Sequence, residues 1–264
     1  MITTRCIDTD TARIAVHARG RGPVALLVHG YPLDHRMWLE TLRSPLAARR
    51  TLVAVDLRGH GQSPWMGDRE HGMDLLANDL ADVLTVLTDQ PADVVALSMG
   101  GYVALALQAQ APHLFRSLCL VDTRATADTD AVRAARFASL TTVVQQGRRA
   151  IADSMLGKLL APQADLLARG RVQSMIEGTP VETILADLQG LMARPDRTPL
   201  LSKITVPTLV VVGEHDAITP PAEARAMAAA IPGARCEVVP GAGHMVPIEA
   251  PDTFVRLLDS FWRD

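Results

Sequence analysis

The stretch VVALSMGG, residues 94–101, decides the fold of this chain. An apolar, β-branched run ends at Ser98, and a helix-forming run begins directly after it, at Met99. Three small residues around the serine let a strand and a helix pack this closely: Ala96, Gly100 and Gly101. Such a turn exposes the side chain at its apex and directs the first amides of the helix toward a bound group. The stretch therefore predicts a nucleophilic serine between a strand and a helix.

One position departs from the usual form of this turn. The pattern is G-x-S-x-G, and here Ala96 occupies the place of the first glycine. Alanine is also small, so close packing at this position remains feasible. A serine between a strand and a helix is, however, often only the N-cap of that helix. The local pattern leaves both interpretations open, and the rest of the chain has to decide between them.

The composition is typical of a globular protein and gives no sign of a nucleic-acid partner. Of the 264 residues, 48% are hydrophobic and 21% are charged, and the formal net charge is −3. Nucleic-acid binding usually shows as a basic excess or stripe, which this balance does not provide. Aromatic residues make up only 3% of the chain, so stacking platforms for bases are not expected either.

The sequence carries no recognisable targeting or metal-binding signal. The first twenty residues contain no apolar run long enough for a signal peptide, and no segment approaches the roughly 18 apolar residues of a membrane span. The three cysteines are far apart and show no metal-ligand spacing: Cys6, Cys119 and Cys236. We therefore expect a cytoplasmic protein that needs no metal and no cofactor and that does not contact a membrane. The oligomeric state is not indicated.

Short apolar runs alternate with helical patterns through most of the chain, which predicts a doubly wound, mostly parallel sheet. Several apolar runs are continuous, as in strands that are covered on both faces. The expected strands are residues 14–18, 24–29, 51–56, 94–98, 117–122, 208–213 and 236–240. The expected helices are residues 36–48, 73–88, 99–111, 221–230 and 251–262. An antiparallel pair at one edge is predicted from residues 2–9 and 14–20.

One long interval, residues 123–201, shows helical patterns and no strand. We predict a helical lid there, inserted into a core domain formed by residues 1–122 and 202–264. Helical patterns are clearest in residues 130–140, 147–156 and 180–192. Because α/β folds bind ligands at the carboxyl edge of the sheet, the lid is expected to cover that edge. The alternative is that these are only additional packing helices.

Candidate partners for Ser98 follow two later strands. A serine hydroxyl needs a base within hydrogen-bond reach, and the base needs an orienting acid. The strand at residues 208–213 leads to Asp216, and the strand at residues 236–240 leads to His244. The order serine, acid, histidine on successive strand ends is typical of serine hydrolases of this architecture.

Several other polar residues offer alternative assignments. Asp122 also follows a strand and is the rival acid, although we interpret it as a cap of the loop beyond it. His29 and His60 are predicted to support loops, and His215 is predicted to point away from the site. Asp56 and Ser63 are interpreted as turn residues.

With these pieces identified, the chain resembles the α/β-hydrolase superfamily over nearly its whole length. The matching segments follow the family's order: HGYP at 29–32, DLRGHGQS at 56–63, the serine turn, GEHD at 213–216 and GAGH at 241–244. The resemblance implies an eight-stranded, mostly parallel sheet with a helical lid after the sixth strand. It also implies the site residues: Ser98 as the nucleophile, His244 as general base and acid, Asp216 as the orienting carboxylate, and the backbone N–H groups of Tyr31 and Met99 as the oxyanion hole.

The segment VDTRATADT, residues 121–129, resembles the branch that contains 3-oxoadipate enol-lactonases. An acidic lactone would need a cation, for which Arg124 is the candidate, with Arg133 and Arg136 as possible helpers. These arginines can equally be solvated lid residues. Tyr31 and Met245 are further candidates for substrate binding. We therefore expect a carboxylesterase or lactonase that acts on a small-molecule ester or lactone.

Two other classes of function stay open at this point. Perhydrolysis (the cofactor-free haloperoxidase activity) and carbon–carbon bond hydrolysis use the same three residues. A non-catalytic binding protein on the same scaffold is less favoured, because it would not need a complete triad. The serine at the turn separates the chain from dehalogenases and epoxide hydrolases, which attack through a carboxylate.

Overall fold

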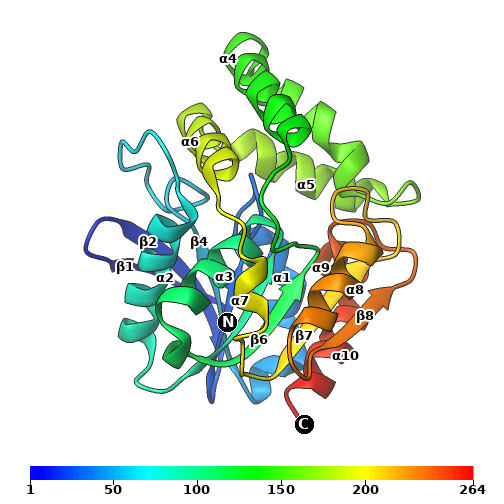
Figure 1. The fold of residues 1–264 in the computed structure, drawn as a ribbon. Helices are drawn as coiled ribbons and strands as arrows, with labels where there is room; N and C mark the ends of the chain where they lie inside the picture. Colours follow the sequence, from blue (N-terminus) through cyan, green and yellow to red (C-terminus); the bar gives the residue numbers. More distant parts are fainter. Residues whose placement is uncertain (264) are drawn as a thin grey trace.

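A computed structural model describes residues 1–263 and contains one sheet of eight strands in the order β1-β2-β4-β3-β5-β6-β7-β8 (Figure 1). β1 and β2 pair antiparallel, β2 and β4 pair antiparallel, and the remaining pairs are parallel. The predicted fold class is confirmed. The strands are β1 (Thr3–Asp8), β2 (Arg13–Gly20), β3 (Val24–Val28), β4 (Thr51–Asp56), β5 (Ala92–Leu97), β6 (Phe115–Val121), β7 (Thr208–Gly213) and β8 (Arg235–Val239).

The central strands are buried along their whole length, which explains their unbroken Val, Leu and Ala sequences. Every residue of β3, β5 and β7 is buried, as expected when helices cover both faces of a parallel sheet. Figure 1 shows helices on both sides of the sheet. The main helices flanking the sheet are α2 (Met73–Leu87), α3 (Met99–Gln110), α8 (Pro221–Ala230) and α10 (Pro251–Phe261), with the short α9 (Val246–Glu249) before the last and a 3₁₀ turn, η3 (Pro112–Leu114), after α3.

The prediction of a single helix at residues 36–48 is wrong. The segment forms three short pieces: η1 (His35–Trp38), α1 (Leu39–Arg43) and η2 (Pro45–Ala48). The break falls at Ser44, whose side chain accepts a hydrogen bond from the amide of Leu46. Pro45 cannot donate a backbone hydrogen bond and so begins a new turn.

The interval between β6 and β7 is helical, as predicted. It contains α4 (Asp130–Leu159), α5 (Leu166–Gly178), α6 (Val181–Ala193) and the short α7 (Thr198–Leu201). The two helical segments predicted at residues 130–140 and 147–156 lie on either side of a kink in α4, where Gly147 has a non-helical backbone (φ 78°). Figure 1 shows α4, α5 and α6 as a separate layer at one end of the sheet.

Helix α6 is fixed to the core by a buried acid and two histidines. Asp187 lies 2.7 Å from Nδ1 of His71 and 2.9 Å from Nε2 of His60, and none of the three is exposed. Burial opposes the charge on His60, but the Asp187 carboxylate outweighs it and raises the pKa of His60. Burial likewise opposes the charge on Asp187, and the two histidines outweigh it and lower the pKa of Asp187. At Gly190 the helix lies so close to the core that a Cβ would sit 1.8 Å from the carbonyl oxygen of His71.

We expect Asp187→Asn to lower the free energy of unfolding by about 3–5 kcal/mol, because it leaves buried histidine without its counter-charge. The loss should be greatest while His60 is charged and should shrink as the pH rises through its raised pKa. Urea unfolding at pH 5.5 and pH 9 measures both effects. The exposed Asp153→Asn serves as the control. An equal loss at both pH values would contradict the ion-pair explanation.

Candidate active site

Ser98 occupies the turn between β5 and α3, as the sequence predicts. Its backbone has φ 53° and ψ −115°, a strained conformation for a residue other than glycine. Two hydrogen bonds hold this conformation. The amide of Ser98 donates to the carbonyl of Val121 (3.0 Å), and the Thr123 hydroxyl donates to the carbonyl of Ser98 (2.7 Å). The neighbouring strand β6 therefore supports the strain that exposes the serine.

Close packing around the turn explains which small residues it needs. A Cβ at Gly100 would lie 2.6 Å from the carbonyl oxygen of Val28, and one at Gly30 would lie 3.1 Å from Cβ of Ser98. Ala96, by contrast, sits inside β5 and is fully buried between β3 and β6. The methyl group fits there as part of the core, so the departure from the glycine pattern leaves the turn intact.

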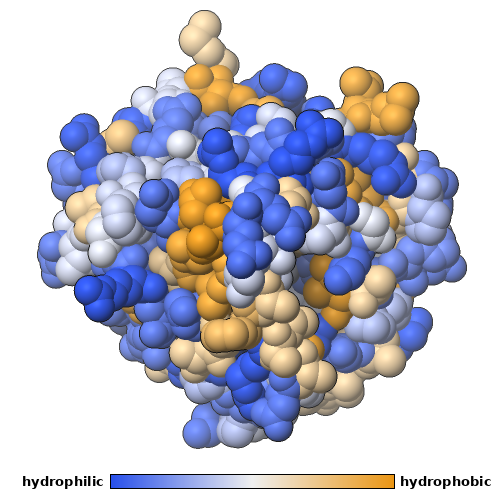
Figure 2. Space-filling view, turned by 90° about the horizontal axis from the view of Figure 1, so that it is seen from above, coloured by the Kyte–Doolittle hydropathy of each residue, from blue (hydrophilic) through white to orange (hydrophobic). Residues whose placement is uncertain are grey.

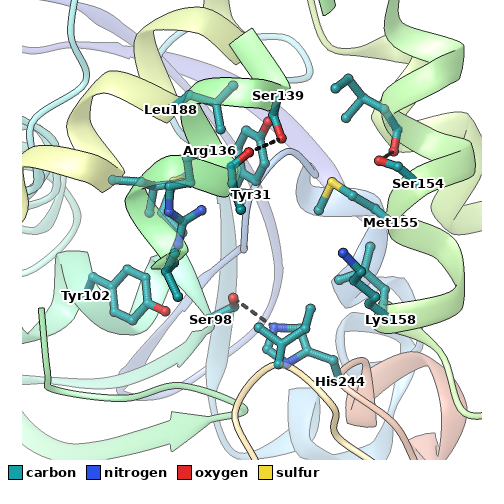
Figure 3. Close-up of a pocket in the computed structure, with 17 residues that line it drawn as sticks. Tyr31, Ser98, Tyr102, Arg136, Ser139, Ser154, Met155, Lys158, Leu188 and His244 are labelled. Atoms are coloured by element: carbon teal, nitrogen blue, oxygen red, sulfur yellow. Dashed lines mark hydrogen bonds between the residues drawn. The ribbon is translucent and has the colours of Figure 1, made fainter. Parts of the chain in front are cut away.

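His244 and Asp216 lie in line behind Ser98. Nε2 of His244 is 2.8 Å from Oγ of Ser98 (Figure 3). Nδ1 of His244 is 2.7 Å from Oδ2 of Asp216. His244 follows β8 and Asp216 follows β7, so both come from loops at the edge of the sheet where Ser98 lies. Both are almost completely buried. The structure thus brings together the three residues selected from the sequence.

Asp216 is held as a carboxylate. Burial opposes its charge, but His244 and several hydrogen-bond donors outweigh burial and lower the pKa of Asp216. The amides of Ile218 and Thr219 both donate to Oδ1, at 2.8 and 2.9 Å. The Thr219 hydroxyl donates to Oδ2, the oxygen that faces His244. An ionised Asp216 can therefore accept a hydrogen bond from Nδ1–H and orient the imidazole.

Asp122, the rival acid, has a different set of partners. Its Oδ1 accepts a hydrogen bond from the amide of Gly213 (2.8 Å), and its Oδ2 accepts one from Val246 (3.4 Å). The predicted role as a cap of the following loop is therefore wrong. Burial and the nearby Asp216 raise the pKa of Asp122 well above the usual carboxyl range. Asp122 braces the start of the acid loop against the segment that follows His244.

A second carboxylate, missed in the sequence, supports the histidine loop. Glu249 accepts hydrogen bonds from the amide of Gly243 (3.0 Å) and from the amide of Ala161 (2.7 Å). The amide of His244 itself donates to the carbonyl of Leu159 at 2.9 Å. These contacts join the end of α4 to the loop that carries His244. No local spacing signals the two contacts with the end of α4, because their partners lie about ninety residues apart.

Beside Ser98 lies a cavity of about 220 Å³ between the sheet edge and the inserted helices. Its lining is mostly apolar: Met99, Val132, Ala135, Ile151, Met155, Leu159, Leu188, Leu191 and Ile218. Besides Ser98 and His244, six polar or amphipathic residues also line it, and Figure 3 shows them around the serine: Tyr31, Tyr102, Arg136, Ser139, Ser154 and Lys158. An apolar cavity with a few polar groups is typical of a small-molecule site.

Two of the three predicted substrate-binding residues lie outside this lining. Arg124 is paired with Glu223 (3.1 Å) and donates to the carbonyl of Ile218. Met245 is fully buried and does not line the cavity. Tyr31 does line it, and within the described residues its buried hydroxyl has no hydrogen-bond partner. The sequence missed Lys158, because its place depends on how α4 packs.

The other histidines take supporting positions. Nε2 of His29 accepts a hydrogen bond from the amide of Leu57 (3.0 Å), and Nδ1–H donates one to the carbonyl of Gly30 (2.9 Å). Burial and the nearby His60 lower the pKa of His29 to about 4, so it stays neutral near pH 7. His215 is exposed and lies near Glu214, away from the serine. The predicted supporting roles of His29 and His60 agree with these contacts.

A second cluster of ionisable residues lies outside the cavity. Ligand atoms of His17, His35 and Asp56 all lie within 4.8 Å of one another. The two imidazoles stack with ring centroids 3.4 Å apart, and both contact the Asp56 carboxylate, at 3.0 and 2.9 Å. The amides of His35 and Gln62 fill its remaining acceptor positions. This arrangement ties the turns after β3 and β4 to β2, so Asp56 does more than shape its own turn.

The face above the inserted helices is mixed in polarity. Figure 2 shows separate apolar areas among mostly hydrophilic residues on this side. The exposed large apolar side chains of α4 and α5 are Phe137, Val144, Leu166 and Leu167. Within residues 1–263, none of the helices combines the length and the apolar character that a membrane span requires.

Comparison with known proteins agrees with the fold and with ester hydrolysis. A family model described as the alpha/beta hydrolase fold matches residues 23–251. A pimeloyl-[acyl-carrier protein] methyl ester esterase from Neisseria meningitidis serogroup B is 33% identical over 242 residues, which cover 89% of this chain and 91% of the relative. A counterpart from Chromobacterium violaceum is 30% identical and covers 92% of this chain and 95% of its own length.

Solved structures of other proteins agree with the same fold. A thermophilic esterase from Thermogutta terrifontis, solved with malate bound, superposes with a TM-score of 0.94 at 33% identity, covering 99% of this chain and 98% of the other. An enol-lactonase from Burkholderia xenovorans superposes with a TM-score of 0.89 at 24% identity, covering 98% of this chain and all of the other. At 24% identity, the similarity to the enol-lactonase supports the fold alone.

Proposed function

Because the chain belongs to the α/β-hydrolase family and is an ester hydrolase, we propose that it cleaves carboxylic esters through Ser98, His244 and Asp216. The observation that carries the proposal is the unbroken pair of hydrogen bonds, 2.8 Å from Ser98 to His244 and 2.7 Å from His244 to Asp216. The substrate is a small ester or lactone that fits the cavity beside Ser98.

In the first half of the reaction the Ser98 oxygen attacks the ester carbonyl. His244 takes the hydroxyl proton at Nε2, and the Asp216 carboxylate stabilises the imidazolium that forms. His244 then gives this proton to the departing alcohol, which leaves the acyl group on Ser98. In the second half His244 removes a proton from water, and the resulting nucleophile attacks the acyl carbonyl. His244 then returns the proton to the departing Ser98 oxygen, which releases the acid and restores the free serine.

The oxyanion hole in this proposal consists of the backbone N–H groups of Met99 and Tyr31. Met99 is the first residue of α3, where an amide has no acceptor within its own helix. Tyr31 follows Gly30, the residue packed against Ser98. Both residues line the cavity with the serine. Donors placed where negative charge develops typically contribute about 10²–10³ in rate each.

We further propose that residues 123–201 act as a lid on a core formed by residues 1–122 and 202–264. Support comes from the lining of the cavity, to which α4 and α6 contribute most of the apolar side chains. A cover of this kind limits the amount of water in the cavity, which strengthens the electrostatic interactions there.

Covalent labelling tests the nucleophile directly. We expect an alkyl fluorophosphonate to modify the protein once per chain, with the serine oxygen displacing fluoride and the adduct located on Ser98 by mass spectrometry. Ser139 and Ser154 line the same cavity and serve as internal controls. An adduct on either of them, with Ser98 unmodified, would contradict the proposal.

An ester panel tests the reaction class. It contains p-nitrophenyl esters of graded acyl length, methyl esters of longer acids, and both enol- and saturated lactones, each assayed with and without hydrogen peroxide. We expect hydrolysis of the esters in the absence of peroxide. Turnover that required peroxide would replace hydrolysis by perhydrolysis.

A further inference from the structure

The charged residues that line the cavity are all basic. Arg136 and Lys158 line it, and within the described lining there is no aspartate or glutamate. Asp216, the nearest acid of the site, is covered by its hydrogen bonds to His244 and Thr219. A ligand in the cavity therefore meets two cationic side chains and no carboxylate in the lining itself.

The two cations differ in their partners. Arg136 donates from Nε to Asp128 at 2.5 Å, and the same carboxylate accepts from Arg194 at 2.6 Å. The ammonium of Lys158, an exposed residue of α4, has no ion pair and no hydrogen bond within residues 1–263. A cation that is left without a partner beside a catalytic serine can pair with a charged group on the ligand.

The position of Lys158 is set by the catalytic histidine loop. Lys158 lies in the last turn of α4, directly before Leu159, whose carbonyl accepts the amide of His244 at 2.9 Å. Figure 3 shows the amino group of Lys158 on the side of the cavity where His244 lies. The backbone contact keeps the lysine next to the reacting centre, although it belongs to an inserted helix.

Lys158 is exposed, so water partly screens an ion pair formed there, and the apolar side chains of the cavity lining reduce that screening. Met155, Leu159 and Ile151 line the same part of α4 and lower the local polarity. Opposite charges attract more strongly next to such apolar groups than in open water. A lysine ammonium offers three donors on a flexible stem and can follow an anion over a range of positions.

We propose that Lys158 is a specificity-determining residue that binds a carboxylate on the substrate, so that the preferred substrates are esters bearing a second, negatively charged group. This inference rests on the proposed function at Ser98 and names its substrate class. The carboxylate can belong to the acyl part, as in the half-ester of a dicarboxylic acid, or to the alcohol part. Both give the same pairing with the ammonium, and the assay below separates them.

Matched pairs of substrates test the proposal. Monomethyl and dimethyl adipate share the same scissile ester and differ in charge on the acyl side, and acetyl esters of 3-hydroxypropanoate and of its methyl ester differ on the alcohol side. We expect a preference of at least about tenfold in kcat/KM for the charged member of one pair, corresponding to about 1.4 kcal/mol. Lys158→Met should remove this preference by raising KM for the charged member of the pair.

Two further variants sharpen the result. Lys158→Arg should retain most of the preference because it keeps the charge. Lys203→Met alters the only other lysine of the chain, which is exposed and outside the cavity lining, and should change nothing. Turnover of neutral esters with no preference in either pair, or an equal rise of KM for both members, overturns the inference and leaves the Ser98 mechanism standing. Absence of all ester turnover overturns the proposed function.

A chemical-protection measurement tests carboxylate binding at Lys158 without relying on turnover. Reductive methylation with formaldehyde and cyanoborohydride modifies both lysines, and mass spectrometry reads each separately. We expect adipate to protect Lys158 and not Lys203, and we expect the neutral adipamide to protect neither. Equal modification of Lys158 with and without adipate contradicts the proposed carboxylate site.

Discussion

Ser98→Ala is expected to lower kcat for ester hydrolysis by at least about 10³-fold, because no other group at the turn can form the acyl intermediate. His244→Ala should cause a loss of similar size, and the double variant should lose little more, since the two residues act as a unit. Steady-state assays with p-nitrophenyl esters measure these effects. Ser154→Ala, in the same cavity, is the matched control and should retain its kcat.

Circular dichroism and thermal unfolding establish that each variant is folded. Removing one hydroxyl from a half-buried turn deletes no core packing, so the Ser98→Ala protein should unfold close to the wild-type temperature. A folded Ser98→Ala variant with undiminished activity contradicts the mechanism outright.

The second large effect is expected at Asp216. Asp216→Asn should lower kcat by about 10⁴-fold, because an amide can hold His244 in the wrong tautomer and cannot stabilise the imidazolium. Asp122→Asn should have a much smaller effect, because its side chain bonds to the amides of Gly213 and Val246. Its raised pKa also favours the uncharged form, which the amide resembles.

The comparison of these two variants is informative because they change neighbouring carboxyl groups by the same chemical step. Kinetics at pH 7–8 with one p-nitrophenyl ester are sufficient. If Asp122→Asn proved the more damaging substitution, the acid of the triad would be Asp122, and the role of Asp216 would be reassigned to support of the loop.

The strand ends were predictable because local sequence determines them. Each of the three proposed triad residues follows an apolar run that forms a parallel strand, and the carboxyl ends of such strands meet at one edge of the sheet. The small residues around Ser98 also predict the strained backbone at this position, since only small neighbours leave room for the turn. For these reasons the position of the site followed from short motifs.

The lining of the cavity was much less predictable. Arg124 directly follows β6 and seemed well placed in the sequence, yet Glu223 of α8 and the carbonyl of Ile218 draw its side chain elsewhere. Lys158 faces the cavity because of a backbone contact between Leu159 and His244, eighty-five residues apart. Contacts of this range depend on the packed fold and leave no mark on local spacing.

The buried clusters of ionisable residues could not be predicted from the sequence for the same reason. His17, His35 and Asp56 come from three separate segments, and His60, His71 and Asp187 join the core to α6. The prediction of one helix at residues 36–48 was wrong for a local reason, because Ser44 and Pro45 together end one turn and begin another.

The joint between α4 and the histidine loop has a consequence for how new specificities arise on this scaffold. The carbonyl of Leu159 at the end of α4 and the amide of Ala161 just after it are main-chain groups. The one side chain of this segment that bonds to the histidine loop among the described contacts, Gln163 to the carbonyl of Gly241, lies beyond the helix. Side chains along α4 can therefore be exchanged without altering the hydrogen bonds that position His244. A combinatorial library of α4 side chains facing the cavity would vary which molecules are accepted while the chemical machinery stays constant.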